Sequence, residues 1–246
     1  MIVLILGSGP NVLQARDWDL SAVDKIVVIN NAWAVRPDWD ILIHPEDFPR
    51  SRRPSAVAPE QTIITAKDYV PLQNELGGFV YAGGTMAFTA GYWALQALAP
   101  TVIAHLGCDM VYADAAKTHF YGKGTADPLR DDISLRSLEA KSARLQAMAA
   151  TRGCAMVNLS TDPSRLTYPR ATLDGLKNIR PKSLNRAAIE AARAAERAAG
   201  YFVPSGRYWE DETIFDPNVI DRIDRLWLNA LPPAYTDLAF ADRRTS

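Results

Sequence analysis

The chain has 246 residues, which is enough for one α/β domain with a substantial core and a helical appendage. Its 27 basic and 28 acidic residues give a net charge of -1, which argues against nucleic acid or anionic lipid as a partner. The two cysteines lack metal-ligand spacing, and the apolar N-terminal run is too short for a signal peptide or a membrane span. These features predict a soluble, cytoplasmic protein with reduced thiols.

The chain begins with the pattern of a buried strand that leads into a glycine-rich turn. Residues 2–6 are five aliphatic residues in a row, and Gly7-Ser8-Gly9-Pro10-Asn11 follows directly. Further apolar runs at 25–29, 40–45 and 61–66 predict three more strands. Because residues 7–24 leave room for a helix between the first two runs, we expect right-handed crossovers and a parallel sheet.

The middle of the chain continues this alternation of strands and helices. A glycine-rich region at 77–85 leads into an apolar helix predicted over 86–98, and the strand predicted over 101–106 ends in Gly107-Cys108-Asp109. The polar segment 110–130 is long for a plain connection, which predicts a lid-like functional loop. An amphipathic helix over 134–151 and a last strand over 155–160 follow.

The composition changes beyond Pro163. An alanine-rich helix is predicted over 183–199 with Gly200 as its stop, and another over 217–231 with Asp216 as cap and Pro217 in the first position. The fold class is therefore predicted to be α/β: a Rossmann-like, open, mostly parallel sheet with helices on both faces in residues 1–170. Residues 171–246 are predicted to form a helical extension that packs on this domain, or that serves formation of a homo-oligomer.

The turn after the first strand departs from the known nucleotide fingerprints. Val12 stands where a dinucleotide motif has its third glycine, and Asn30 and Asn31 stand where that motif has an acidic residue for the ribose. A P-loop is excluded because no Gly-Lys-Ser/Thr follows. The turn is then either a variant phosphate or nucleoside site, with Ser8 and Asn11 as side-chain donors, or a simple tight turn.

The strand-end asparagines also have two interpretations. They are either a turn and helix-cap pair or amides that read a base or sugar at the carboxyl edge of the sheet. His44 ends a strand at the same edge, so it either binds a ligand or caps the strand, and Asp109 either contacts a ligand or fixes its loop.

The remaining titratable groups differ in their expected roles. His119 lies in a polar loop beside Tyr121 and Gly122 and is predicted to be a general base, because an ordinary histidine pKa of about 6.5 is near the working pH. His105, within an apolar strand, is predicted to be a hydrogen-bonded core residue. The Asp-x-Asp pairs at 17–19 and 38–40 are predicted to be solvated turn residues.

Several stretches together resemble the bacterial sialyltransferases of glycosyltransferase family 42 and the related domain-of-unknown-function proteins that include a methanopterin-pathway pyrophosphokinase. The resemblance covers about residues 1–170. It is carried by Gly7-Ser8-Gly9-Pro10-Asn11, Asn30-Asn31, Ile43-His44-Pro45-Glu46-Asp47-Phe48, Gly83-Gly84-Thr85-Met86, Leu106-Gly107-Cys108-Asp109 and His119-Phe120-Tyr121-Gly122.

The resemblance implies a metal-independent, inverting transfer of sialic acid from CMP-sialic acid to a sugar hydroxyl, with no cofactor. His119 would deprotonate the acceptor, and the hydroxyls of Tyr112 and Tyr121 would stabilise the departing phosphate. The residues expected to hold the nucleotide are Gly7, Ser8, Gly9, Asn11, Asn30, Asn31, His44, Gly84, Thr85 and Asp109. The expected partners are a nucleotide-sugar donor and a glycan acceptor.

Two further functions stay open. A pyrophosphokinase-like phosphotransferase would hold Mg²⁺ through Asp109 and one Asp-x-Asp pair. A non-catalytic module would keep the nucleotide fold while its His119 points away from the site. The same fold can host each of these functions.

Overall fold

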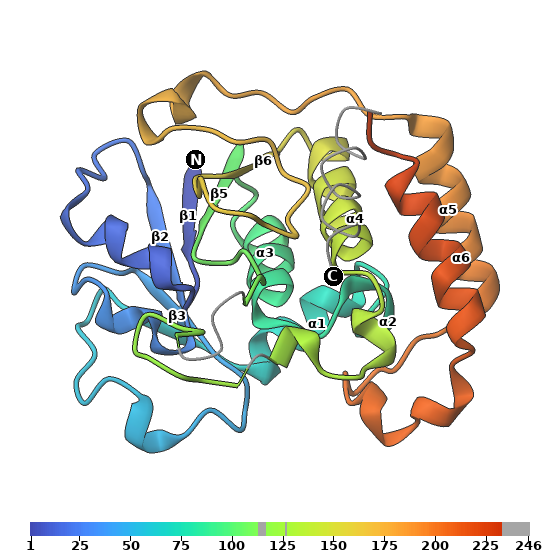
Figure 1. Ribbon diagram of the computed structural model, residues 1–246, viewed down its shortest axis with the longest axis horizontal. Coiled ribbons are helices and arrows are strands. Elements are labelled where there is room, and N and C mark those ends of the chain that lie inside the picture. The colour runs from blue at the N-terminus through green and yellow to red at the C-terminus, as the bar shows by residue number, and fades with distance from the viewer. Residues whose placement is uncertain (113–116, 126, 233–246) are drawn as a thin grey trace.

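The computed structural model describes residues 1–112, 117–125 and 127–232 (Figure 1). Within these ranges a six-stranded sheet has the order β4-β3-β2-β1-β5-β6, and every neighbouring pair is parallel. The predicted open, Rossmann-like α/β fold is therefore confirmed. The strands are β1 (Ile2–Leu6), β2 (Lys25–Ile29), β3 (Ile41–Ile43), β4 (Thr62–Ile64), β5 (Val102–Leu106) and β6 (Ala155–Asn158).

The central strand is apolar on both faces because both faces are covered. Val3 and Ile5 of β1 belong to one buried cluster, whereas Leu4 and Leu6 belong to a second cluster on the opposite face. All five residues of β1 are buried, as expected for a strand in the middle of a parallel sheet.

The two faces of the sheet are covered by different kinds of helix. The first face carries α1 (Ala66–Asn74), α2 (Phe79–Ala82), α3 (Met86–Ala97) and α4 (Leu138–Thr151). The second face is covered by three 3₁₀ helices, η1 (Pro10–Asp17), η2 (Asn30–Ala34) and η6 (Leu173–Asn178). The other 3₁₀ helices are η3 (Arg50–Arg52), η4 (Asp127–Leu129), η5 (Ile133–Leu135), η7 (Tyr208–Glu210) and η8 (Glu212–Ile214). Helices thus cover both faces, but the crossovers after β1 and β2 carry 3₁₀ helices of eight and five residues in place of α-helices.

Helix α1 is an element that the sequence analysis did not predict. Thr65 and Asp68 form a capping box at its start: the Asp68 carboxylate accepts from the Thr65 backbone N–H at 2.9 Å. Pro71 lies inside this nine-residue helix and weakens its sequence signal. The Thr-x-x-Asp spacing is a helix-start signature that could have revealed it.

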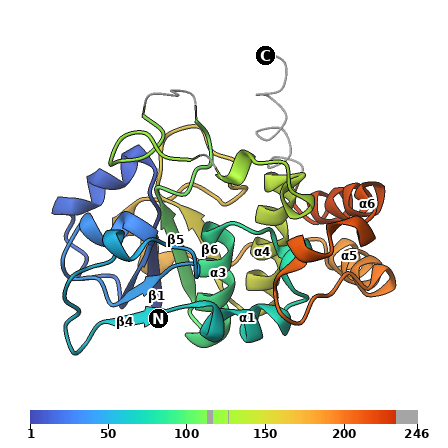
Figure 2. The ribbon, with the colours of Figure 1, turned by 90° about the horizontal axis from the view of Figure 1, so that it is seen from below.

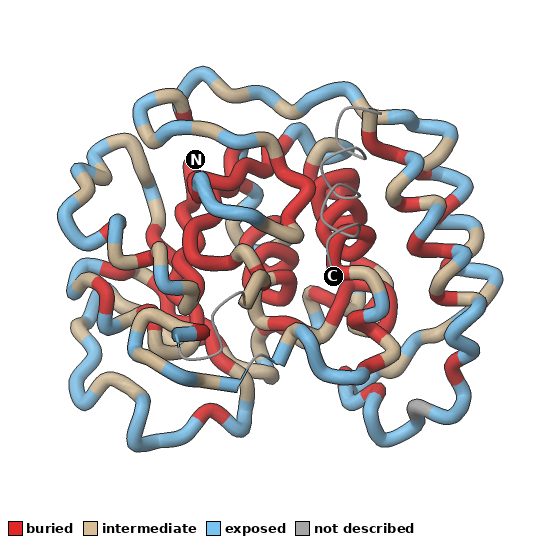
Figure 3. Tube along the Cα trace, in the orientation of Figure 1, coloured by how far each residue is buried: buried red, intermediate tan, exposed pale blue. Residues whose placement is uncertain are grey.

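The helix predicted over 134–151 is present as α4, but it is buried on nearly all sides, so the expectation that its polar face meets water is wrong. Lys141 and Arg144 are 1 % and 0 % exposed, which leaves these two cations without water. Figure 3 shows α4 coloured as buried along most of its length, between α3 and the C-terminal helices. The polar stripe of α4 is therefore an internal contact surface.

The C-terminal extension supplies what covers α4 (Figure 1). Helices α5 (Arg186–Ala199) and α6 (Pro217–Leu228) pack against each other and on the outer side of α4, where Asp224 pairs with Lys141 at 2.7 Å and Glu196 with Arg144 at 2.7 Å. The predicted cap of α6 is confirmed, because the Asp216 carboxylate accepts from a backbone N–H of the first turn. Residues 233–246 of this extension lie outside the described ranges.

Two further predictions concern the whole chain. Cys108 and Cys154 are free, buried thiols, as expected, and burial raises the pKa of the Cys154 thiol to about 12. None of the helices in the described part of the chain is long and apolar enough to cross a membrane.

Candidate functional site

The order of the strands places a candidate site at the carboxyl ends of β1 and β5. From β1 the chain moves outward to β2, β3 and β4 on one side, and β5 and β6 lie on the other side, so the strand order reverses between β1 and β5. Open α/β proteins bind ligands at such a switch point. Figure 2 shows η1 and the loop that precedes α4 on the side of the sheet opposite to the N-terminus, which is this carboxyl edge.

The glycines after β1 are required by contact between two loops. Gly7 N–H donates to Leu106 O at 2.8 Å, and Gly9 N–H donates to Gly107 O at 2.8 Å. A Cβ atom on Gly7 would lie 2.6 Å from Cys108 Sγ and 2.8 Å from the Gly107 carbonyl carbon. Gly7 and Gly9 therefore allow the loops after β1 and β5 to pack closely, and the backbone N–H of Gly9, one of the residues expected to hold the nucleotide, already has a partner within the protein.

Asn11 and Asp109, both expected among the nucleotide-binding residues, contact each other directly. The Asn11 amide Nδ2 donates to Asp109 Oδ2 at 2.7 Å, to Ser160 Oγ at 2.8 Å and to Asp162 Oδ2 at 3.0 Å. Asn158 Nδ2 donates to the other oxygen of Asp109 at 3.0 Å. These five residues form the switch-point network, which ties together the loops after β1, β5 and β6.

The sequence analysis missed the contribution of β6 to this network. Asn158 and Ser160 are polar residues at the end of the strand predicted over 155–160. Their position at a strand end could have indicated that β6 also contributes side chains to the site. Asp109 here has the loop-fixing role that was one of its two interpretations, while Asn11 Oδ1 is buried without a hydrogen bond from the described residues.

The asparagines after β2 follow Ile29, whose carbonyl accepts from the Ser8 hydroxyl at 3.5 Å. Asn30 begins η2 with a φ of 52°, a left-handed conformation that non-glycine residues adopt rarely and asparagine more readily than most. Its Oδ1 is buried, and no hydrogen bond from the described residues reaches it. The Asn31 side chain interacts with the Tyr121 hydroxyl. Asn31 therefore contacts the loop that carries the predicted base.

The loop at 117–124 folds back over the turn after β1. Phe120 N–H donates to Ser8 O at 3.0 Å, and His119 and Gly122 exchange two backbone hydrogen bonds at 2.9 and 3.0 Å. His119 consequently lies beside Tyr121, with ring centroids 5.0 Å apart, and Tyr112 flanks it at 6.1 Å. The three predicted catalytic residues form one aromatic cluster at the carboxyl edge, although 113–116 of their loop lie outside the described residues.

The Thr118 hydroxyl contacts the His119 ring. It accepts from Gly124 N–H at 2.8 Å and lies 2.8 Å from His119 Nδ1 and 3.0 Å from Gly124 O. Its one proton can go to either Gly124 O or Nδ1; in the tautomer in which it goes to Gly124 O, Nδ1 carries the ring proton and donates to Thr118. In that tautomer Nε2 is the unprotonated nitrogen, which is the form required of a general base.

The electrostatic environment keeps His119 neutral and its tyrosine neighbours protonated. Burial lowers the pKa of His119, the positive charge of Arg52 lowers it further, and Asp127 opposes the shift. Burial raises the pKa of Tyr112 to about 12, and it also raises that of Tyr121. At neutral pH the cluster therefore offers one base and two hydroxyl donors.

The other predicted nucleotide-binding residues have partners within the protein. His44 is 2 % exposed, its Nδ1 lies 2.8 Å from Pro45 O, and its ring packs on Phe48, as in the interpretation of a capped strand end. Gly84 N–H donates to Ser134 Oγ at 2.9 Å, and the Thr85 hydroxyl caps α3. Nucleotide binding by His44, Gly84 and Thr85 stays a prediction.

Tyr208 of the C-terminal extension covers Gly84. Its hydroxyl donates to Asp132 Oδ2 at 2.8 Å and accepts from Ser134 Oγ at 3.0 Å, and a Cβ atom on Gly84 would collide with it. Sequence reasoning gave no signal for this contact, because 124 positions separate the two residues along the chain.

His105 is buried, as predicted, but without the hydrogen bonds expected of it. No bond of normal geometry from the described residues reaches either ring nitrogen, and the ring packs on Tyr168 at 5.0 Å. Burial lowers its pKa to about 4, so it remains neutral in the core.

The acidic residues of the described chain do not gather into a metal site. No group of three or more His, Cys, Asp or Glu residues is placed to hold an ion in that part of the chain. Asp38 pairs with Arg36 and Asp40 with Lys25, and both precede β3, whereas Asp109 follows β5. Because the strands are parallel, the 38–40 pair lies at the amino edge of the sheet, away from Asp109.

Comparison of the chain with protein-family models, with curated proteins and with solved structures finds no match. Function must therefore be argued from the site.

Proposed function

We propose that the protein is a metal-independent glycosyltransferase that moves a sugar from a CMP-activated donor to an acceptor hydroxyl. The observation that carries the proposal is the position of the His119 ring between Tyr112 and Tyr121, with the Thr118 hydroxyl 2.8 Å from its Nδ1 and able to accept from it. The resemblance to family 42 sialyltransferases, which rests on the same histidine loop, supports this choice among the reactions that a general base could serve.

The chemistry requires one base and stabilisation of one leaving group. His119 Nε2 takes the proton of the acceptor hydroxyl as its oxygen bonds to the anomeric carbon of the donor. The bond from that carbon to the phosphate oxygen breaks, and its electron pair leaves with CMP. Tyr112 and Tyr121 donate hydrogen bonds to the phosphate, and the nearby charge of Arg52 adds to this stabilisation.

Binding and transfer are tested separately. We expect CMP to raise the melting temperature in the presence of a chelator, and Asn31→Ala to reduce this effect. His119→Ala should abolish release of CMP from CMP-sialic acid in the presence of galactoside acceptors, while its response to CMP stays near that of the wild type.

A separate variant with a matched control tests whether Thr118 positions the His119 ring for catalysis. Thr118→Val should lower kcat by about 10²-fold, within the range of general-base catalysis, with KM for the donor nearly unchanged. Thr62→Val, at an exposed position of the edge strand β4, should leave both constants unchanged. A protein that responds to no cytidine nucleotide contradicts the proposal.

A Mg²⁺-dependent phosphotransferase is the second candidate, because Asp109 and Asp162 converge on one amide at the switch point. Carboxylates that share one edge with a phosphate can hold Mg²⁺. The Asp-x-Asp pair at 38–40 lies at the opposite edge of the sheet, so under this alternative Asp162 would supply the second carboxylate that was expected from such a pair. Binding of ATP that depends strictly on Mg²⁺ and is lost in Asp162→Asn would select this function.

A further inference from the structure

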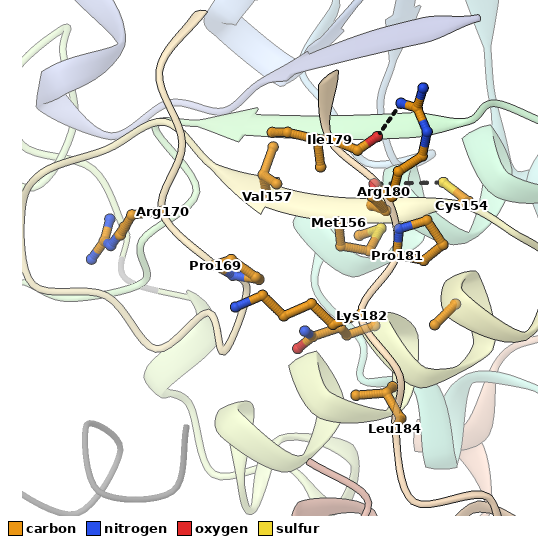
Figure 4. Close-up of a pocket in the computed structure, with 13 residues that line it drawn as sticks. Cys154, Met156, Val157, Pro169, Arg170, Ile179, Arg180, Pro181, Lys182 and Leu184 are labelled. Atoms are coloured by element: carbon orange, nitrogen blue, oxygen red, sulfur yellow. Dashed lines mark hydrogen bonds between the residues drawn. The ribbon is translucent and has the colours of Figure 1, made fainter. Parts of the chain in front are cut away.

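A cavity of about 280 Å³ lies along the outer edge of β6. Its floor is formed by residues 154–157, and the segment 179–184 crosses over it, as Figure 4 shows. Ile179, Pro181 and Leu184 of this segment supply apolar walls. The volume is near the lower end of ligand pockets in proteins, so the cavity suits apolar side chains on a short stretch of chain.

The strand edge in this cavity is open for one residue. β6 is the last strand of the sheet, and Ala155 and Leu159 donate to β5, so the N–H and C=O of Met156 point away from β5. Asn158, the next outward-facing residue, is already paired with the segment 169–171. No hydrogen bond from the described residues reaches the backbone of Met156. Since proteins generally cover or pair the edges of their sheets, Met156 offers one donor and one acceptor to a further segment.

The described part of the chain ends close to this cavity. Asn185 directly follows the wall residue Leu184, and its N–H donates to Ala230 O at 3.1 Å. The last described residue, Pro232, is two positions after Ala230, and residues 233–246 lie outside the described ranges. A chain of that length spans about 45 Å when extended, so each of its residues can reach the cavity.

The sequence beyond Pro232 contains one run of three apolar residues. It is Leu238-Ala239-Phe240, between Asp237 and Ala241-Asp242. In an extended chain the side chains of Leu238 and Phe240 lie on the same face, so both can enter the cavity while the backbone between them pairs with the strand edge.

The small size of the contact favours a segment of the same chain over a separate partner. One backbone bridge and a few apolar contacts give a free peptide a dissociation constant of about 1 mM at best. A short connection to the binding site supplies an effective concentration in the millimolar range. A tethered segment therefore occupies the cavity at a strength of contact that leaves a free partner mostly unbound.

We propose that Leu238-Ala239-Phe240 docks in this cavity and pairs with Met156 as a one-residue addition to the sheet. The end of the chain thereby closes the open edge of β6. This proposal does not depend on the glycosyltransferase function.

The position of the segment is measured in the full chain labelled with ¹⁵N-methionine. A nitroxide on Asp242→Cys should broaden the amide signal of Met156 strongly and that of Met86, in α3, much less. Cys108 and Cys154 are buried thiols and should not take up the label. Equal broadening of the two methionine signals, or none, would contradict the proposal.

A mixed sample identifies which copy of the chain supplies the segment. Chains with ¹⁵N-methionine and no nitroxide are mixed with nitroxide-bearing chains that carry no isotope. The Met156 signal should keep its width in this mixture. Broadening would show that a second copy donates the segment and would overturn docking within one chain.

Variants test the two sides of the contact. Phe240→Asp should speed hydrogen exchange at the Met156 amide about tenfold or more, and Ala150→Phe, which fills the cavity, should abolish the broadening by the nitroxide. Thr245→Asp is the matched control, because it adds the same charge beyond the apolar run and should leave the exchange rate unchanged. If Met156 exchanges no faster in Phe240→Asp than in Thr245→Asp, the assigned contact is wrong.

Discussion

The ion pair between Arg144 and Glu196 gives the sharpest test of how the C-terminal helices are held. Arg144 donates from Nε to Glu196 Oε1 at 2.7 Å and from Nη2 to Oε2 at 2.9 Å, and Trp227 Nε1 donates to the same carboxylate at 2.7 Å. The side chains of Arg144 and Glu196 are 0 % and 8 % exposed. Glu196→Gln keeps the shape but leaves the guanidinium charge buried without a counter-charge.

The expected cost is large because water cannot replace the lost charge. Removing one partner of a buried ion pair costs about 3–5 kcal/mol, a large share of the roughly 5–15 kcal/mol by which a domain is stable. Glu190→Gln is the control: Glu190 faces Arg193 at 3.7 Å on the exposed side of α5, where such a pair contributes about 0–1 kcal/mol.

Urea unfolding followed by tryptophan fluorescence measures both variants, with the free energy taken from the midpoint and the slope. The double variant Arg144→Met/Glu196→Met should regain part of the lost stability, because it leaves neither charge of the pair in the core. If Glu196→Gln costs no more than Glu190→Gln, the pair is open to water in solution and our account of the interface between α4 and α5 is wrong.

Three further predictions use other parts of the molecule. Because the pKa of His119 is held below its ordinary 6.5, the neutral base form prevails at pH 7. The transfer rate should therefore be constant above pH 7 and decrease only when the pH is lowered below about 6.5. A rate that already decreases while the pH is lowered from 8 to 7 would contradict this reasoning. Gly7→Ala should destabilise the fold by about 1–3 kcal/mol, since its Cβ would meet backbone, whereas Gly175→Ala meets only the end of a side chain and should be mild in thermal unfolding. Tyr208→Phe removes a buried hydroxyl with three partners and should cost about 1–3 kcal/mol in urea unfolding; a neutral result would show that its partners find water.

Elements whose signal is local were predictable from the sequence. β1 is five aliphatic residues in a row, and α6 begins with an Asp-Pro start at 216–217. Helix α1 was missed although Thr65 and Asp68 carry its capping box, because Pro71 interrupts the pattern. At the site, Asn11 and Asp109 were both expected among the nucleotide-binding residues, but neither their direct contact nor the contribution of β6 was predicted.

The sequence by itself determined the strands and the grouping of His119 with Tyr121 in one loop, because these depend on residues close together in the chain. Only the tertiary structure decided which residues meet across long separations. The charged stripe of α4 looks like a solvent face until Glu196 and Asp224 arrive from 52 and 83 positions away to neutralise it. Amphipathic patterning reports polarity, and it cannot report whether water or an opposite charge satisfies that polarity.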